Sequence, residues 1–263
     1  MANKAFSRKE SIRVAPLHQP KAKVDLSELY EGKKGKAPAK AKLTYRGGAL
    51  LTNVEVFTIF WGKDWNTATY KPVADAMNAF FDTILQSTLI DQLAEYNVPA
   101  YKIGKGKRTG TITISTGAPT HSITDSAIQA QLSKWISTNK SFPKQNKNTL
   151  YFIYFESGVV VSQGGSKSCS SFCGYHDAIG TKTFYAVMPF PSCQGCLGGN
   201  NAIDALTGTS SHELCEAITD PVPGAGWYDD HNGEIADICA WQFKKLAGYN
   251  VQLEWSNKAG KCI

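Results

Sequence analysis

Three side chains in the segment SSHELCEAITDP, residues 210–221, are of types that bind metal ions or move protons. His212 and Glu216 are four positions apart, and Glu213 directly follows His212. On a helix, residues four apart lie on one face, so the imidazole and the carboxylate point the same way. Both groups are zinc ligands, with bonds of about 2.0–2.2 Å. We therefore expect them to bind one ion together.

The spacing is that of the H-E-x-x-H signature of zinc peptidases, with glutamate replacing the second histidine. The replacement keeps a ligand and adds negative charge, which makes manganese or calcium more suitable than at a two-histidine site. Zinc remains the expected ion. In the signature, the glutamate beside the first histidine takes the proton of the attacking water, which gives Glu213 the role of general base. The alternative is an ordinary amphipathic helix without an ion.

A third ligand is expected from the acid-rich segment GWYDDHNGEIADIC, residues 226–239. Glu234 is the first choice. Asp237 is a reserve ligand, and it is also a candidate for supporting a helix ligand through a hydrogen bond. His231 is a reserve ligand, and with Tyr228 it is a candidate for stabilising an oxyanion. The part HNGEIADIC is typical of a turn followed by a strand. His176, on a loop rich in cysteine, is the remaining reserve ligand.

The elements that must position these residues follow from the apolar pattern. Strands are predicted at 53–62, 109–116, 149–156, 158–163 and 183–190. Helices are predicted from about 72 to 96, at 122–138, and over the segment 200–221 that carries His212, ending near Thr219 because Pro221 follows. The strand at 149–156 is almost wholly apolar, as expected of a strand covered on both faces.

This alternation predicts a single α/β domain over 45–263, with a mixed, mostly parallel sheet covered by helices. The order of elements is similar to that of the zincin metalloproteases, in which a mixed sheet leads into the metal-binding helix. Residues 1–44 are predicted to be a basic, disordered arm, because they are rich in lysine and lack a sustained apolar period.

Charge and hydropathy exclude two classes of partner. Residues 1–42 contain 11 Lys and Arg against 4 Asp and Glu, so the remaining chain is close to neutral. No aromatic residues alternate with the lysines of KGKAPAKAK to stack on bases, so no nucleic-acid partner is expected. A run of eighteen apolar residues is absent from the sequence, and no membrane-spanning helix is expected.

Seven cysteines all lie in the last part of the chain, which favours a disulfide-bonded protein in an oxidising, extracellular compartment. Six of them are disulfide candidates: Cys169, Cys173, Cys193, Cys196, Cys239 and Cys262. Their connectivity stays open, and Cys215 is the odd one. The pairs CSSFC and CQGC also have the spacing of a zinc ribbon. The N-terminal sequence shows no apolar core of a secretory signal.

Three stretches together resemble the phosphate-induced, Exordium-like family: YRGGALLTNVEVFTIFWG, SSFCGYH and PSCQGC. The last two are similar to that family's two cysteine pairs, and Cys239 and Cys262 fit its final two cysteines. The resemblance covers about 45–263. It implies an extracellular, disulfide-bonded domain, associated in plants with the cell wall and growth responses. The plant members lack His212, Glu213 and Glu216, whereas the microbial branch has the H-E-x-x-E motif.

The sequence therefore predicts a metal-dependent hydrolase of the zinc-peptidase type, acting on a peptide or protein substrate. His212, Glu216 and Glu234 are the expected ligands and Glu213 the expected base. The alternative is a non-enzymatic, Exordium-like extracellular binding or signalling protein with a structural ion or none. The sequence leaves the oligomeric state open.

Overall fold

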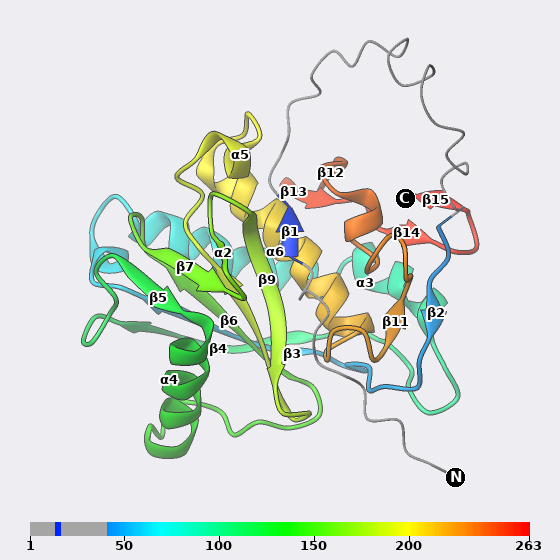
Figure 1. The fold of residues 1–263 in the computed structure, drawn as a ribbon, viewed down its shortest axis with the longest axis horizontal. Coiled ribbons are helices and arrows are strands. Elements are labelled where there is room, and N and C mark those ends of the chain that lie inside the picture. Colours follow the sequence, from blue (N-terminus) through cyan, green and yellow to red (C-terminus); the bar gives the residue numbers. More distant parts are fainter. Residues whose placement is uncertain (1–13, 17–40) are drawn as a thin grey trace.

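The computed structural model describes residues 14–16 and 41–263. Within this part of the chain, the largest sheet has six strands in the order β1-β9-β10-β6-β3-β4 (Figure 1). These strands are β1 (Val14–Pro16), β9 (Phe172–Ile179), β10 (Thr183–Met188), β6 (Thr149–Phe155), β3 (Glu55–Trp61) and β4 (Lys107–Ile114). β10, β6, β3 and β4 are parallel, whereas β9 runs antiparallel to β10 and β1 antiparallel to β9. The prediction of a mostly parallel α/β sheet is confirmed.

Two apolar cores cover the two faces of this sheet. Alternate residues of β6 enter different cores: Phe152 packs with helices α2 (Lys71–Ile84), α3 (Thr88–Leu93) and α6 (Ala202–Thr219), and Ile153 packs with α4 (Asp125–Thr138). All seven residues of β6 are buried, as the two-sided apolar run predicts. The helix α6 therefore lies on the α2 side, against the sheet.

Shorter elements complete the described part of the chain. Three small sheets have two strands each: β2 (Thr44–Tyr45) with β11 (Trp227–Tyr228), β12 (Phe243–Leu246) with β13 (Tyr249–Gln252), and β14 (Trp255–Ser256) with β15 (Lys261–Cys262). A separate three-stranded sheet consists of β5 (Ser122–Thr124), β7 (Val160–Gln163) and β8 (Ser166–Lys167). The remaining helices are α5 (Gln194–Leu197) and the 3-10 turns η1 (Asp64–Asn66), η2 (Ala94–Tyr96) and η3 (Asp237–Cys239).

Two predicted helices have different boundaries in the structure. The pattern at 72–96 is not one helix, because the side chain of Ser87 accepts a hydrogen bond from the N–H of Leu89 and starts α3 as a separate helix. The helix predicted at 122–138 begins only at Asp125, since Thr124 is its N-cap and residues 122–124 form β5. The apolar period identified the helical surface but not these caps.

Two segments near the site were predicted wrongly. The segment around His176, expected to be a loop, is the strand β9, whose pattern was obscured by the flanking cysteines and glycine. The segment HNGEIADIC, expected to end in a strand, forms the 3-10 turn η3 instead. Glu234 lies before this turn, so only Asp237 is positioned by it.

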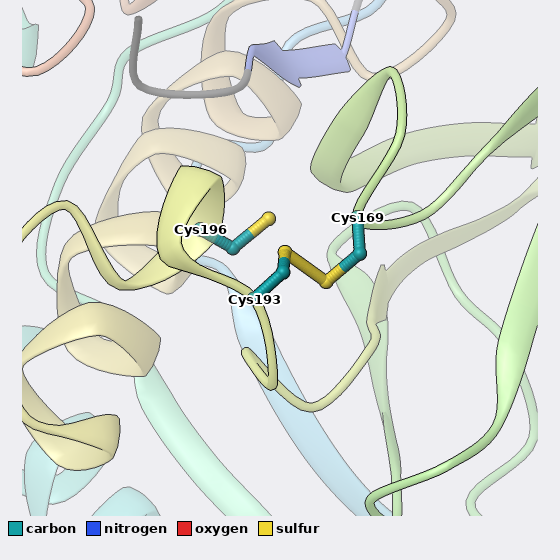
Figure 2. Close-up of side chains that lie close together, drawn as sticks. All are labelled: Cys169, Cys193 and Cys196. Atoms are coloured by element: carbon teal, nitrogen blue, oxygen red, sulfur yellow. A yellow bond between two sulfur atoms is a disulfide. The ribbon is translucent and has the colours of Figure 1, made fainter. Parts of the chain in front are cut away.

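The six candidate cysteines form three disulfides, and Cys215 is a buried free thiol. The bridges are Cys169–Cys193, Cys173–Cys196 and Cys239–Cys262. Figure 2 shows Cys196 beside the Cys169–Cys193 bridge. The zinc-ribbon alternative is therefore wrong, because these sulfurs are bonded to one another. Three disulfides fit an extracellular protein.

Replacing Cys239 and Cys262 together by alanine is expected to lower the free energy of unfolding by about 3 kcal/mol, because the bridge closes a loop in the unfolded chain. Denaturant unfolding of the variant and the wild type measures the difference. Replacing the free, buried Cys215 by alanine is the matched control, since it removes a sulfur without opening a loop. Equal losses in both variants would contradict the expectation.

The N-terminal region contains one placed strand. Val14–Pro16, within the segment predicted to be a disordered arm, forms β1 on the sheet. The rest of that prediction up to residue 40 lies outside the described residues, and the chain is described again from Ala41. Among the described helices, none is both long and apolar enough to cross a membrane.

Candidate metal centre

The helix α6 is held in place at both ends and buried along most of its length. The side chain of Asn201 caps its start by accepting from the N–H of Asp204, at 2.9 Å. At its end, the carboxylate of Asp220 accepts hydrogen bonds from the backbone N–H groups of residues 224–226. Gly208 lets Phe243 pack closely, since a Cβ there would lie 2.8 Å from that ring. The helix is thus fixed between the central sheet and the β12-β13 hairpin.

His212 and Glu216 lie one turn apart on α6, as their spacing predicts. Nε2 of His212 is 3.0 Å from Oε1 of Glu216, and both side chains are at most 1% exposed. In the described structure, His212 Nε2 makes no hydrogen bond of ordinary geometry. Ligand atoms around one tetrahedral zinc ion are about 3.4 Å apart, given bonds of about 2.1 Å. The two atoms therefore converge as neighbouring ligands do.

The amide of Gln252 determines which nitrogen of His212 carries its proton. Nε2 of Gln252 donates to the carbonyl of Ala236 at 2.8 Å, so Oε1 is the atom that faces the imidazole. That oxygen accepts from the N–H of Trp241 at 3.3 Å and lies 3.1 Å from Nδ1 of His212. Nδ1 is therefore the donor, and the lone pair of the neutral ring is on Nε2. Histidines that bind metals are commonly oriented in this way.

Asp237 completes the first group of possible ligands. Its Oδ1 is 3.9 Å from Nε2 of His212, and its backbone N–H donates to Oε1 of Glu216 at 3.2 Å. The turn η3 brings it there. Each of His212, Glu216 and Asp237 offers one atom within 4.8 Å of the other two, an arrangement able to hold a metal ion.

A second group shares Glu216 with the first. His176 and Glu234 offer atoms that lie, together with a Glu216 oxygen, within 4.8 Å of one another. Nδ1 of His176 is 3.5 Å from Oε2 of Glu216, and its Nε2 is 3.6 Å from Oε1 of Glu234. Nε2 also lies 3.1 Å from the carbonyl of Asp220, to which it donates when protonated. The strand β9 and the turn after β11 supply these two side chains.

Glu213 lies between the second group and β1. Its Oε2 is 3.2 Å from Nδ1 of His176, and its Oε1 accepts a hydrogen bond from the backbone N–H of Ala15 at 3.1 Å. The side chain is fully buried. Burial raises the pKa of this carboxyl above its ordinary value, and His176 opposes the rise. A raised pKa suits a general base that must hold a proton during a reaction.

The cluster carries an excess of buried acid. Burial raises the pKa of Glu234 well above its ordinary value. Burial also disfavours the charged forms of His212 and Glu216, but their mutual attraction outweighs it. The pKa of His212 is therefore raised well above its ordinary value and that of Glu216 is lowered to about 2. Without a cation, the cluster must take up protons to offset its negative charge.

Several atoms of this cluster lack hydrogen bonds, although buried polar groups in native proteins are almost always paired. Within the described residues these atoms are Nε2 of His212, Oε2 of Glu216 and both carboxylate oxygens of Glu234. They belong to the two ligand groups. A bound cation would satisfy them, so the donor set fits a metal ion. Imidazole together with carboxylate favours zinc or manganese over calcium, which prefers oxygen alone.

The sequence located some of these residues and misplaced others. Of the expected ligands, His212 and Glu216 lie together, while Glu234 joins His176 across Glu216 rather than His212. Asp237, a reserve ligand that was also expected to support a helix ligand, lies in one group with His212 and Glu216. His231 is exposed in the turn between Asp229 and Gly233 and belongs to neither group.

Gln252 was not predicted to be part of the site, because it lies 40 positions from His212 and a lone glutamine in a strand does not indicate a functional role. Tyr228, the other candidate for stabilising an oxyanion, lies in β11, where the side chain of Arg46 stacks over its ring.

Comparison with known proteins assigns neither a family nor a function to this chain. No protein-family model matches this chain, and neither does any curated protein or solved structure.

Proposed function

We propose that the chain is a zinc-dependent peptidase in which His212, Glu216 and Asp237 hold the ion. The supporting observation is the pair of buried atoms His212 Nε2 and Glu216 Oε1, which face each other without a hydrogen bond while Gln252 fixes the ring. Asp237 replaces the expected Glu234 as third ligand because it is the carboxylate grouped with His212. The zincin-like element order expected from the sequence supports this as an analogy.

The residues of the site suit peptide hydrolysis. Glu213 takes a proton from water, whose oxygen attacks the carbonyl carbon of the peptide bond. The C–N bond then breaks, and the proton passes from Glu213 to the leaving nitrogen, giving a carboxylate and an amine. His176, 3.2 Å from Oε2 of Glu213, holds that carboxylate in position. The ion, when bound, supplies positive charge that polarises the carbonyl and acidifies water.

The direct test combines metal content with hydrolysis. Purified full-length protein should contain about one zinc per chain by elemental analysis. Chelation should abolish cleavage of a mixture of fluorogenic peptides, and one equivalent of Zn²⁺ should restore it. Mn²⁺ and Ca²⁺ are tested in parallel, and activity with Ca²⁺ alone would contradict the imidazole-containing site. A protein without stoichiometric metal would contradict the whole proposal.

Replacing Gln252 by leucine is expected to weaken zinc binding by about tenfold to a hundredfold, since partners that orient a ligating histidine have effects of this size. Competition with a chromophoric chelator measures the affinity. Gln163→Leu is the matched control, because Gln163 is also buried but lies on β7, on the other side of the sheet. An equal loss in both variants would show a general effect on the fold.

A second function is supported by the burial of the site. His176, His212, Glu213, Glu216 and Glu234 are each at most 1% exposed, which suits an ion that only stabilises the fold. The protein would then be the non-enzymatic, Exordium-like extracellular binding protein of the alternative prediction. Stoichiometric zinc together with no cleavage of any peptide, both by the wild type and by a variant in which β1 is displaced from β9, would favour this function over the peptidase.

A further inference from the structure

The strand β1 occupies the open edge of the central sheet beside the candidate metal centre. It pairs antiparallel with β9, with Val14 opposite Tyr175 and Ala15 opposite Gly174. In Figure 1 it lies across α6, the helix that carries His212 and Glu216. β9 is antiparallel to β10 and would be the last strand of this sheet without β1. An uncovered edge of this kind binds extended peptides through backbone hydrogen bonds.

The backbone of β1 also reaches the proposed general base. The N–H of Ala15 donates to Oε1 of Glu213 at 3.1 Å, across 198 positions of sequence. With His176 on the other oxygen, both atoms of this carboxylate are engaged. β1 therefore occupies one oxygen of the carboxylate that the proposed reaction needs.

The surroundings of Ala15 form a small apolar seat for one side chain. Ala15 is 5% exposed and packs in a cluster with the disulfide-bonded Cys173 and Cys196 and with Trp241. A shallow pocket next to it extends to His212, Gln252 and Trp241. Opposite Ala15, Gly174 allows β9 to lie close to α6, because a Cβ there would be 2.8 Å from Cγ2 of Thr209. The seat fits a small residue of an extended chain.

We infer that β1 is an internal occupant of the substrate site and blocks this site until it is displaced. The substrate is an extended polypeptide that pairs antiparallel with β9 and has a small side chain in the place of Ala15. That the bound peptide is a substrate rests on the proposed peptidase function. β1 and an added peptide would then compete for the same edge of β9.

The test displaces β1 in the full-length protein. Ala15→Arg puts a charged side chain into the apolar seat, and Ala15→Pro removes the N–H that reaches Glu213. Ala259→Arg, in the exposed turn between β14 and β15, is the control. The probe is a fluorescein-labelled peptide of sequence ESIRVAPLHQP, residues 10–20, and fluorescence anisotropy measures its binding. The same peptide with arginine in the place of alanine is the second probe.

Both Ala15 variants are expected to bind the first probe about tenfold more tightly than the wild type, because a tethered segment competes at an effective concentration on the order of 1 mM. Ala259→Arg should bind like the wild type, and the arginine probe should not bind any protein. Equal binding by all four proteins, or by both probes, would overturn the inference. Thermal melting shows whether the variants are folded. If one of the two Ala15 variants does not fold, the other still tests the inference.

The two proposals fail separately. If the probe binds the Ala15 variants tightly but no peptide is cleaved at any metal loading, the strand edge is a peptide site and the peptidase proposal is wrong. If peptides are cleaved while the Ala15 variants neither bind the probe more tightly nor cleave faster, the peptidase stands and the blocking role of β1 is wrong.

Discussion

Glu213→Gln protein is expected to keep its zinc and to lose peptide hydrolysis by about a hundredfold to ten-thousandfold, the usual contribution of a general base. Glutamine has the shape of glutamate but cannot accept the proton of water. Its amide oxygen can still accept a hydrogen bond from the N–H of Ala15, so β1 keeps its contact with residue 213. Rates at saturating substrate and elemental analysis of the same sample measure the two effects.

The matched control for this experiment is Glu254→Gln. Glu254 is also fully buried, and burial raises its pKa well above the ordinary value, so an uncharged amide replaces it closely. It belongs to neither group of possible ligands. This variant should cleave peptides close to the wild-type rate. Unchanged activity in Glu213→Gln, or equal loss in both variants, would remove Glu213 from the reaction.

His212→Ala is expected to weaken zinc binding by more than about a hundredfold, because it removes the nitrogen ligand of the first group. The free energy of binding to the folded protein adds to stability, by about 2.7 kcal/mol when zinc exceeds its dissociation constant a hundredfold. Zinc should therefore raise the melting temperature of the wild type and leave that of His212→Ala almost unchanged. Calorimetry with and without zinc measures both.

His176→Ala separates the two possible sites. It removes the nitrogen of the second group while His212, Glu216 and Asp237 remain. Zinc binding should persist in this variant, whereas hydrolysis should fall because Glu213 loses the partner of its Oε2. Loss of zinc in His176→Ala with retention in His212→Ala would reverse the assignment and place the ion between His176, Glu216 and Glu234.

Local patterns in the sequence were enough to predict the core and the helix that carries His212 and Glu216. Six of the seven residues of β6 are apolar and all seven are buried, a run that is typical of a strand covered on both faces. The spacing of His212 and Glu216 fixes their shared face once the segment is helical. These features depend on residues close in sequence, so they can be predicted without knowledge of the tertiary structure.

The remaining ligands depend on contacts that the sequence does not reveal. His176 is brought to the site by the pairing of β9 with β10, which the cysteines around it concealed. Asp237 replaces Glu234 beside His212 because residues 237–239 coil into a 3-10 turn, whereas the apolar alternation there suggested a strand. The orientation of Gln252 is fixed by the carbonyl of Ala236, a contact between two separate elements.

The bridge between Cys239 and Cys262 anchors the turn that carries Asp237. It joins the end of η3, two residues after Asp237, to the penultimate residue of the chain. We expect reduction of this bridge to loosen the turn that carries Asp237 and so to weaken zinc binding at the proposed centre, which competition with a chelator in the presence and absence of reductant would measure.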